Sequence, residues 1–176
     1  GDVYKRQIQA KTQEHRQRPK VIEVNDTSHI QRGPFDLRFF NVNHSIPECL
    51  GIVIKTGAGM VVHTGDVKMD QTPPDGKPTD LPALSRYGDE GIDLFLCEST
   101  NATIPGFSGS EADLAPTLRR LIMDAKQRVI VAAFASNVYR VQAVIDAAVK
   151  AGRKVAFNGR SMTVSYTHLR AHETDS

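Results

Sequence analysis

The chain has 176 residues and a formal net charge of +2, with 22 Lys and Arg against 20 Asp and Glu. This near balance gives no electrostatic signature of a nucleic-acid binder, and 40% apolar residues are enough for a core. No apolar run approaches the roughly 18–20 residues of a membrane span. Two cysteines, Cys49 and Cys97, in a chain without a signal-peptide pattern indicate a reducing compartment. We therefore expect a cytoplasmic protein without a membrane partner, with one domain or parts of two.

Both ends of the chain point to a non-native origin. Asp2–Gln7 can be encoded by DNA whose reverse complement, read in another frame, encodes Val164–Leu169. The ends therefore fit one DNA element in inverted orientation, which resembles a transposon-type sequencing adapter. We predict that Gly1–Gln7 and Thr163–Ser176 are adapter translations and not part of the native fold. The native protein is then expected to be longer on both sides.

Short apolar runs predict several strands in the first hundred residues. They are Lys20–Val24, Phe35–Phe40, Leu50–Lys55, Met60–His63 and Ile92–Cys97. The third and fourth runs are continuous rather than alternating, which indicates a sheet covered on both faces. Asn25–Gly33, which contains His29, is polar and predicts a solvated loop. Leu81–Tyr87 predicts a short helix, Ile92–Cys97 a buried strand, and Cys97 a small core residue.

The pattern changes after Ala102–Gly109, a linker where we place a domain boundary. Ser110 and Asp113 form a capping-box pattern at the start of an apolar repeat with helical spacing. A strand, a helix and a second strand are then predicted in turn. Their ranges are Arg128–Phe134, Asn137–Ala151 and Lys154–Phe157. Such a unit is expected to be parallel and right-handed, so the fold class predicted is α/β.

Two residues at strand ends have the chemistry of metal ligands. His44 lies in a loop after one strand, and Asp66 lies just past a second. Zinc in catalytic centres takes imidazole and carboxylate, and an Asp with two oxygens can bridge two ions. Gly65 allows a sharp turn that would bring Asp66 out at the sheet's end. An ordinary histidine at His44 and an Asx-turn cap at Asp66 stay open as alternatives, and His63 is favoured as a packed, hydrogen-bonded residue.

Further candidates follow later strands. Glu98 ends an apolar strand, where a carboxylate is costly unless it is paired or near a cation, which favours a functional or network role. The helix start after Ser136 and Asn137 offers N–H groups to a phosphate, with Arg140 one turn in and Ser161 ending the next strand similarly. Simple helix capping by Ser136 or Asn137 is the alternative.

Several blocks together carry a resemblance. They are His44–Glu48, His63–Asp66, Cys97–Asn101, Pro105–Phe107, Phe134–Asn137 and Gly159–Met162. From Ile8 to Met162 the chain resembles the metallo-β-lactamase-fold ribonucleases with a β-CASP insertion, and among these ribonuclease J. The resemblance implies part of a metallo-β-lactamase αββα sandwich over 8–104, followed by the start of a β-CASP α/β domain over 105–162.

The resemblance also implies a function. It is hydrolysis of RNA phosphodiester bonds by a metal-bound hydroxide, as an endonuclease, a 5′→3′ exonuclease or both, in RNA decay and in RNA processing, including that of rRNA. His44 matches a zinc ligand, Asp66 the ligand that bridges two zinc ions, and Glu98 an acidic motif residue where many relatives carry Asp. RNA and further copies of the full-length chain are the implied partners. The motif His-x-His-x-Asp-His is absent from the chain, so we expect this chain alone to be inactive and to bind zinc poorly.

Two alternatives stay open. One is another metallo-β-lactamase-fold hydrolase that acts on a small ester, thioester or lactam, against which the second, phosphate-suited unit argues. The other is a non-catalytic scaffold in which the strand-end residues merely cap.

Overall fold

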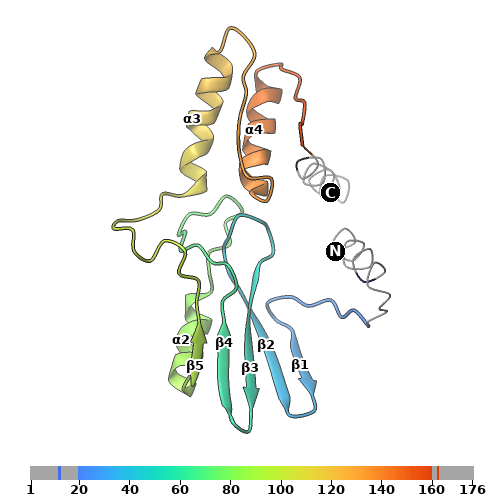
Figure 1. The fold of residues 1–176 in the computed structure, drawn as a ribbon, viewed down its shortest axis with the longest axis vertical. Helices are drawn as coiled ribbons and strands as arrows, with labels where there is room; N and C mark the ends of the chain where they lie inside the picture. The colour runs from blue at the N-terminus through green and yellow to red at the C-terminus, as the bar shows by residue number, and fades with distance from the viewer. Residues whose placement is uncertain (1–11, 13–19, 160–161, 163–176) are drawn as a thin grey trace.

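The computed structural model describes residues 20–159 together with Thr12 and Met162. This part is mixed α/β, as predicted, and forms two lobes (Figure 1). The sheet lobe contains β1–β5 and α2 (Leu81–Glu90), and the helical lobe contains α3 (Glu111–Asp124) and α4 (Val138–Lys150). The predicted adapter translations and Ser161 lie outside the described residues. Within those residues, no helix combines the length and apolar character needed to span a bilayer.

The sheet has five strands in the order of the chain. They are β1 (His29–Arg32), β2 (Phe35–Asn41), β3 (Leu50–Thr56), β4 (Gly59–His63) and β5 (Leu94–Leu96). The first four strands are antiparallel neighbours, and β5 lies parallel to β4 after the crossover through α2. The strands predicted at β2, β3 and β4, and the short helix at α2, are therefore confirmed.

The core of the sheet lobe is centred on Phe40, which is 1% exposed. Phe40 pairs with Gly51 on β3, and its ring occupies the space that a Cβ of Gly51 would take. On its other side the ring lies 6.3 Å, centroid to centroid, from Tyr87 of α2. The opposite sheet face, with Ile52 and Ile54, is only half-buried. Among the described residues α2 packs against one face, and cover of the second face stays a prediction.

Local caps define the two helices of the helical lobe. Ser110 caps α3 with the predicted capping box to Asp113, and Asn137 caps α4. Gly152, in the left-handed region with φ 65°, follows the end of α4 as predicted. Ile122 of α3 packs against small residues of α4, and Ile46 packs against the start of α4. The loop after β2 thus joins the two lobes.

The structure corrects the predictions at the start of the chain. Lys20–Val24 forms no strand, and β1 lies inside the segment predicted as a loop, beginning at His29. β1 is a polar edge strand, so it lacks the apolar pattern on which the prediction depended. A two-residue turn through Gly33 pairs it with β2, and His29 Nε2 lies 2.7 Å from Asp36 Oδ1.

The two strands predicted around α4 are also wrong for this structure. Arg128–Phe134 and Lys154–Phe157 are irregular, although the helix between them forms as expected. Ile130 is 86% exposed and Phe134 is 80% exposed. A strand needs a neighbour to satisfy its backbone groups, and neither segment pairs with another described strand. The apolar pattern of these segments therefore indicates a preference for strand structure, but no neighbouring strand in the described part pairs with them.

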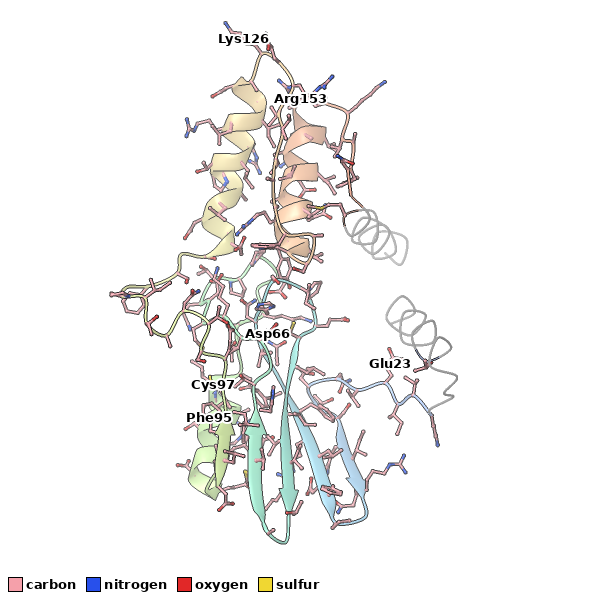
Figure 2. The ribbon with its side chains drawn as sticks, in the orientation of Figure 1. Glu23, Asp66, Phe95, Cys97, Lys126 and Arg153 are labelled. Atoms are coloured by element: carbon pink, nitrogen blue, oxygen red, sulfur yellow. The ribbon has the colours of Figure 1, made fainter. Side chains whose placement is uncertain are left out.

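The last strand forms, but it is not buried. β5 has three residues, and Phe95 is 49% exposed. Cys97, just beyond it, is exposed as well, so its predicted role as core filling is wrong. Figure 2 labels Phe95 and Cys97 at the edge of the sheet, where β5 has β4 on one side. An edge position explains the exposure, because only one neighbour covers the strand.

Candidate active site

Three loops meet at the edge where β2, β4 and β5 end. Residues 42–49 follow β2, residues 64–70 follow β4, and residues 97–101 follow β5. The last residue of β4, His63, pairs with both β3 and β5, which places these ends side by side. Functional side chains of open sheets gather at such strand ends, so this edge is the candidate site.

His44 has a defined place in the loop after β2. It is half-buried, and its ring Nδ1 lies 3.1 Å from the Ser45 hydroxyl. The loop is held on both sides, since the Lys68 N–H donates to the Asn43 carbonyl at 2.7 Å and the Val138 N–H donates to the Ser45 carbonyl at 2.9 Å. A hydroxyl at Nδ1 fixes the ring orientation and leaves Nε2 as the atom for a metal or a substrate.

Glu98 is part of a hydrogen-bond network, as its strand-end position predicted. Its Oε2 accepts the Val67 N–H at 2.9 Å. A hydrogen bond from the Thr100 side chain, the Val67 N–H and the nearby His44 together hold the pKa of Glu98 below its ordinary value, against the opposing effect of burial. Glu98 is therefore a carboxylate at neutral pH, suited to face a cation and without a proton to donate.

Asp66 is exposed in the loop after β4. Figure 2 shows it between the sheet lobe and the helical lobe. Gly65, with φ 64°, makes the predicted turn in the left-handed region. The Gly65 N–H donates to His63 Nδ1 at 2.8 Å, so His63 is hydrogen-bonded as expected, but its side chain lies at the surface. Burial raises the pKa of the Cys49 thiol, and the charge of Asp66 adds to that rise.

A cleft of about 940 Å³ lies between the two lobes. His44 and Glu98 line it from the sheet lobe, and Glu111 and Arg140 line it from the helical lobe. Asp66 belongs to the same sheet edge but is not among the lining residues. The structure therefore unites two of the three predicted strand-end residues in one cavity and leaves the third beside it.

The start of α4 forms part of the cleft wall. Asn137 lines it, and its Oδ1 accepts the Arg140 N–H at 3.0 Å. The side chain of Asn137 thus caps its own helix, which was one of the two alternatives. Ser136 is exposed, and its carbonyl accepts from the Ser45 hydroxyl at 3.5 Å. The phosphate-binding role of Ser136, Asn137 and Arg140 stays a prediction, as does that of Ser161 outside the described residues.

Sequence reasoning missed an ionic group beside Arg140. Arg140 Nη2 lies 2.7 Å from Glu111 Oε1, and its Nε donates to Glu111 Oε2 at 3.3 Å. Lys68 Nζ lies 3.5 Å from the same Glu111 Oε1. Asp70, whose side chain is 2% exposed, accepts from the Ser110 hydroxyl at 2.9 Å. No sequence signal links these residues, because their spacings, about 40 positions in the last case, match no local period.

The described residues do not make a complete zinc site. A catalytic zinc takes three protein ligands, and the described part of the chain has no converging group of three or more His, Cys, Asp or Glu. His44 and Asp66 have suitable donor chemistry on neighbouring loops. They would supply part of a site whose other ligands lie elsewhere.

The sequence comparisons give consistent matches. The family model described as "Ribonuclease J, beta-CASP domain" matches residues 126–172. Ribonuclease J of Corynebacterium glutamicum is 75% identical over 155 residues, covering 88% of this chain and 22% of the relative. Ribonuclease J of Mycolicibacterium smegmatis is 59% identical over 155 residues, covering 88% of this chain and 28% of the relative. Ribonuclease J of Thermus thermophilus is 48% identical over 141 residues, covering 80% of this chain and 25% of the relative. The chain thus spans about a quarter of these relatives' length.

A solved structure shares the fold. The crystal structure of a protein of unknown function from Enterococcus faecalis V583 superposes with a TM-score of 0.53 at 19% identity. The matched region includes 73% of this chain and 31% of the chain in that structure. At this identity the likeness concerns the fold alone.

Proposed function

Because the chain belongs to the ribonuclease J family over the 88% of it that the Corynebacterium glutamicum relative covers, we propose that the protein of which it is part hydrolyses RNA phosphodiester bonds. In this proposal residues 8–104 are part of a metallo-β-lactamase domain and residues 105–162 begin a β-CASP domain. The proposed reaction is endonucleolytic, 5′→3′ exonucleolytic or both, and serves RNA processing and decay.

One observation carries the proposal. The cleft places His44 and Glu98 on one wall and cationic Arg140, near the start of α4, on the other. A phosphodiester needs a cation for its charge and an acceptor for the proton of attacking water. Glu98, an ionised carboxylate on the cleft wall, is the proposed acceptor. A neutral lactam or ester would use the first wall but has no need of Arg140 on the second.

We propose two zinc ions as the cofactor of the whole protein. Bound zinc would supply hydroxide at neutral pH and stabilise charge on the phosphate. From this chain His44 would offer Nε2, and Asp66, proposed to act in catalysis as well, would offer its exposed carboxylate. The Ser45 hydroxyl at 3.1 Å from Nδ1 would hold the His44 ring in place. The remaining ligands are expected outside this chain, which lacks His-x-His-x-Asp-His.

A comparison of the full-length protein with this chain tests the proposal. The substrate is a 5′-monophosphorylated RNA, with a lactam as the alternative substrate. We expect the full-length protein to cleave the RNA, to lose activity with a chelator and to regain it with zinc, while the chain alone stays inactive. Internal products would indicate endonuclease action, and single nucleotides from the 5′ end would indicate exonuclease action.

Three results would count against the proposal. Lactam cleavage without RNA cleavage would favour the small-substrate hydrolase. Less than one zinc per full-length chain would favour a non-catalytic scaffold, and strong zinc-dependent cleavage by this chain alone would contradict its expected inactivity. We also propose a cytoplasmic homo-oligomer, which cell fractionation and light scattering of the full-length protein would check.

A further inference from the structure

Glu111 joins cations from both lobes at the wall of the cleft. Its carboxylate contacts Arg140 of α4 through both oxygens, at 2.7 Å and 3.3 Å, and Lys68 of the loop after β4 at 3.5 Å. The Glu111 side chain is 13% exposed, less than either cation. An ion pair in such partial burial is screened less by water and salt than a surface pair, so it can fix the positions of its members.

The two-point contact fixes one edge of the Arg140 guanidinium. Glu111 engages Nε and Nη2. A guanidinium has five N–H donors in a rigid plane, so holding one edge sets the direction of the other. Arg140 lines the cleft, and the donors at its Nη1 edge are those left for an oxyanion there. Glu111 thus orients Arg140 without consuming its ability to bind phosphate.

The backbone of Glu111 is itself anchored to the sheet lobe. Its N–H donates to Asp70 Oδ2 at 3.2 Å. The Ser110 hydroxyl donates to the same Asp70 oxygen and to the Thr72 carbonyl at 2.7 Å. Asp70 lies two residues after Lys68 in the loop that also carries Asp66. One short loop therefore determines the positions of Lys68 and of Glu111, and through Glu111 that of Arg140.

We infer that Glu111 is a positioning residue for RNA binding. It holds Arg140 and Lys68 on the cleft wall so that their cationic groups bind backbone phosphates of a single-stranded RNA next to His44 and Glu98. This inference rests on the proposed function. It differs from a competitor role, in which phosphate would displace Glu111, because the carboxylate takes only one edge of the guanidinium.

Variants of the full-length protein test the inference on a 5′-monophosphorylated single-stranded RNA. They are E111Q, E111D, R140Q and the double variant E111Q/R140Q, with E90Q as the matched control. Glu90 pairs with Lys55 at 3.1 Å on the sheet lobe and does not line the cleft. The measurements are kcat, KM and the dependence of the RNA Kd on salt concentration, with circular dichroism of each variant as the fold control.

We expect E111Q to raise KM about tenfold with kcat nearly unchanged, as for a lost charge-assisted contact that serves binding alone. The slope of log Kd against log salt should fall by about 0.7, the value for one phosphate contact on a single strand. The double variant should be weaker than R140Q by less than the effect of E111Q alone, because Glu111 acts partly through Arg140 and partly through Lys68. E111D keeps the charge on a shorter side chain, so it should fold and lie between wild type and E111Q. E90Q should match wild type.

Three results would overturn the inference. The first is kinetics for E111Q and E111D equal to those of E90Q. The second is tighter RNA binding with a steeper salt slope in E111Q, which would make Glu111 a competitor. The third is additive effects of E111Q and R140Q. In each case RNA cleavage by the wild type would leave the proposed function intact, whereas a wild type that neither binds nor cleaves RNA would refute both.

Discussion

Replacing Asp70 by Asn should release the first turn of α3. The Oδ1 atom of Asp70 accepts the Thr72 N–H at 3.0 Å, while Oδ2 accepts the Ser110 hydroxyl at 2.9 Å and the Glu111 N–H at 3.2 Å. An Asn that keeps Oδ1 in place presents an amide NH₂ in place of Oδ2, and that group donates and cannot accept. The variant also removes a negative charge near the positive end of the α3 dipole.

The magnitude follows from the contacts that are lost. A hydrogen bond to a charged group contributes about 1.5–3 kcal/mol. The Ser110 hydroxyl keeps the Thr72 carbonyl as a partner, so the main losses are the Glu111 bond and the charge. We therefore expect the opening of this turn to become easier by about 2–3 kcal/mol, which corresponds to exchange of its amide hydrogens about 30- to 150-fold faster.

Hydrogen exchange measured by mass spectrometry on the full-length protein is the assay, because it reports local opening in a protein that need not unfold in two states. Peptides that cover 110–118 should exchange faster in D70N, while those of α2 should not. The matched control is D80N, since Asp80 caps α2 by accepting the Ala83 N–H at 2.8 Å. Unchanged exchange at α3 in D70N, or the same change there in D80N, would refute the anchoring role of Asp70.

Three further predictions follow from the sheet lobe and its ionised carboxylates. Burial raises the pKa of Asp70, but hydrogen bonds and Lys68 outweigh it and hold that pKa below its ordinary 3.8. The stability that the carboxylate contributes is therefore present above pH 3.8 and is lost as pH falls through the folded-state pKa. The effect of D70N on hydrogen exchange, corrected for intrinsic rates, should vanish below that pKa and persist at higher pH. G51A should lower the free energy of unfolding, measured in urea, by about 1–3 kcal/mol, because the new methyl group would overlap the Phe40 ring. The control G57A should lower it less, because a Cβ at Gly57 meets no atom within 4 Å, and equal effects of the two variants would contradict the packing argument. E98Q should lower kcat on RNA about 100-fold or more with a small change in KM, and equal kcat in E98Q and wild type would exclude Glu98 as a proton acceptor.

The parts of the fold that were predicted correctly are those with local signals. Strands β2 to β4 are apolar runs bounded by turn residues, and the helices carry caps within a few positions of their apolar stripes. The errors concern elements decided by a distant partner. β1 is polar because it is an edge, and it forms because Gly33 turns it back onto β2. Arg128–Phe134 has the composition of a strand, but without a paired neighbour in the described part it stays irregular.

The candidate site divides in the same way. His44 and Glu98 were found because a polar residue directly after an apolar strand is visible in the sequence, and resemblance gave them roles. His44 and Glu98 lie in one cleft because the register of the strands brings the ends of β2 and β5 to the same edge of the sheet. Glu111 was not found, because a Glu in the first turn of a helix has an ordinary explanation in the helix dipole. Its contact with Arg140 arises only when α3 and α4 pack together, and its contact with Lys68 only when the two lobes come together.

Net charge concealed the electrostatics of the cleft. At +2 overall the chain shows no excess of cations, and this matters for non-specific attraction to RNA, which scales with summed charge. Specific binding depends instead on a few cations in fixed directions. In the cleft, Lys68 and Arg140 both pair with Glu111, and the carboxylates of Glu98 and Asp113 line the same cavity. The proposed metal ions beside a phosphate would need such carboxylates, so a near-neutral composition agrees with the proposed function. In the proposed mechanism the affinity for RNA depends on the orientation of the Arg140 guanidinium, and the net charge of a sequence gives no information about that orientation.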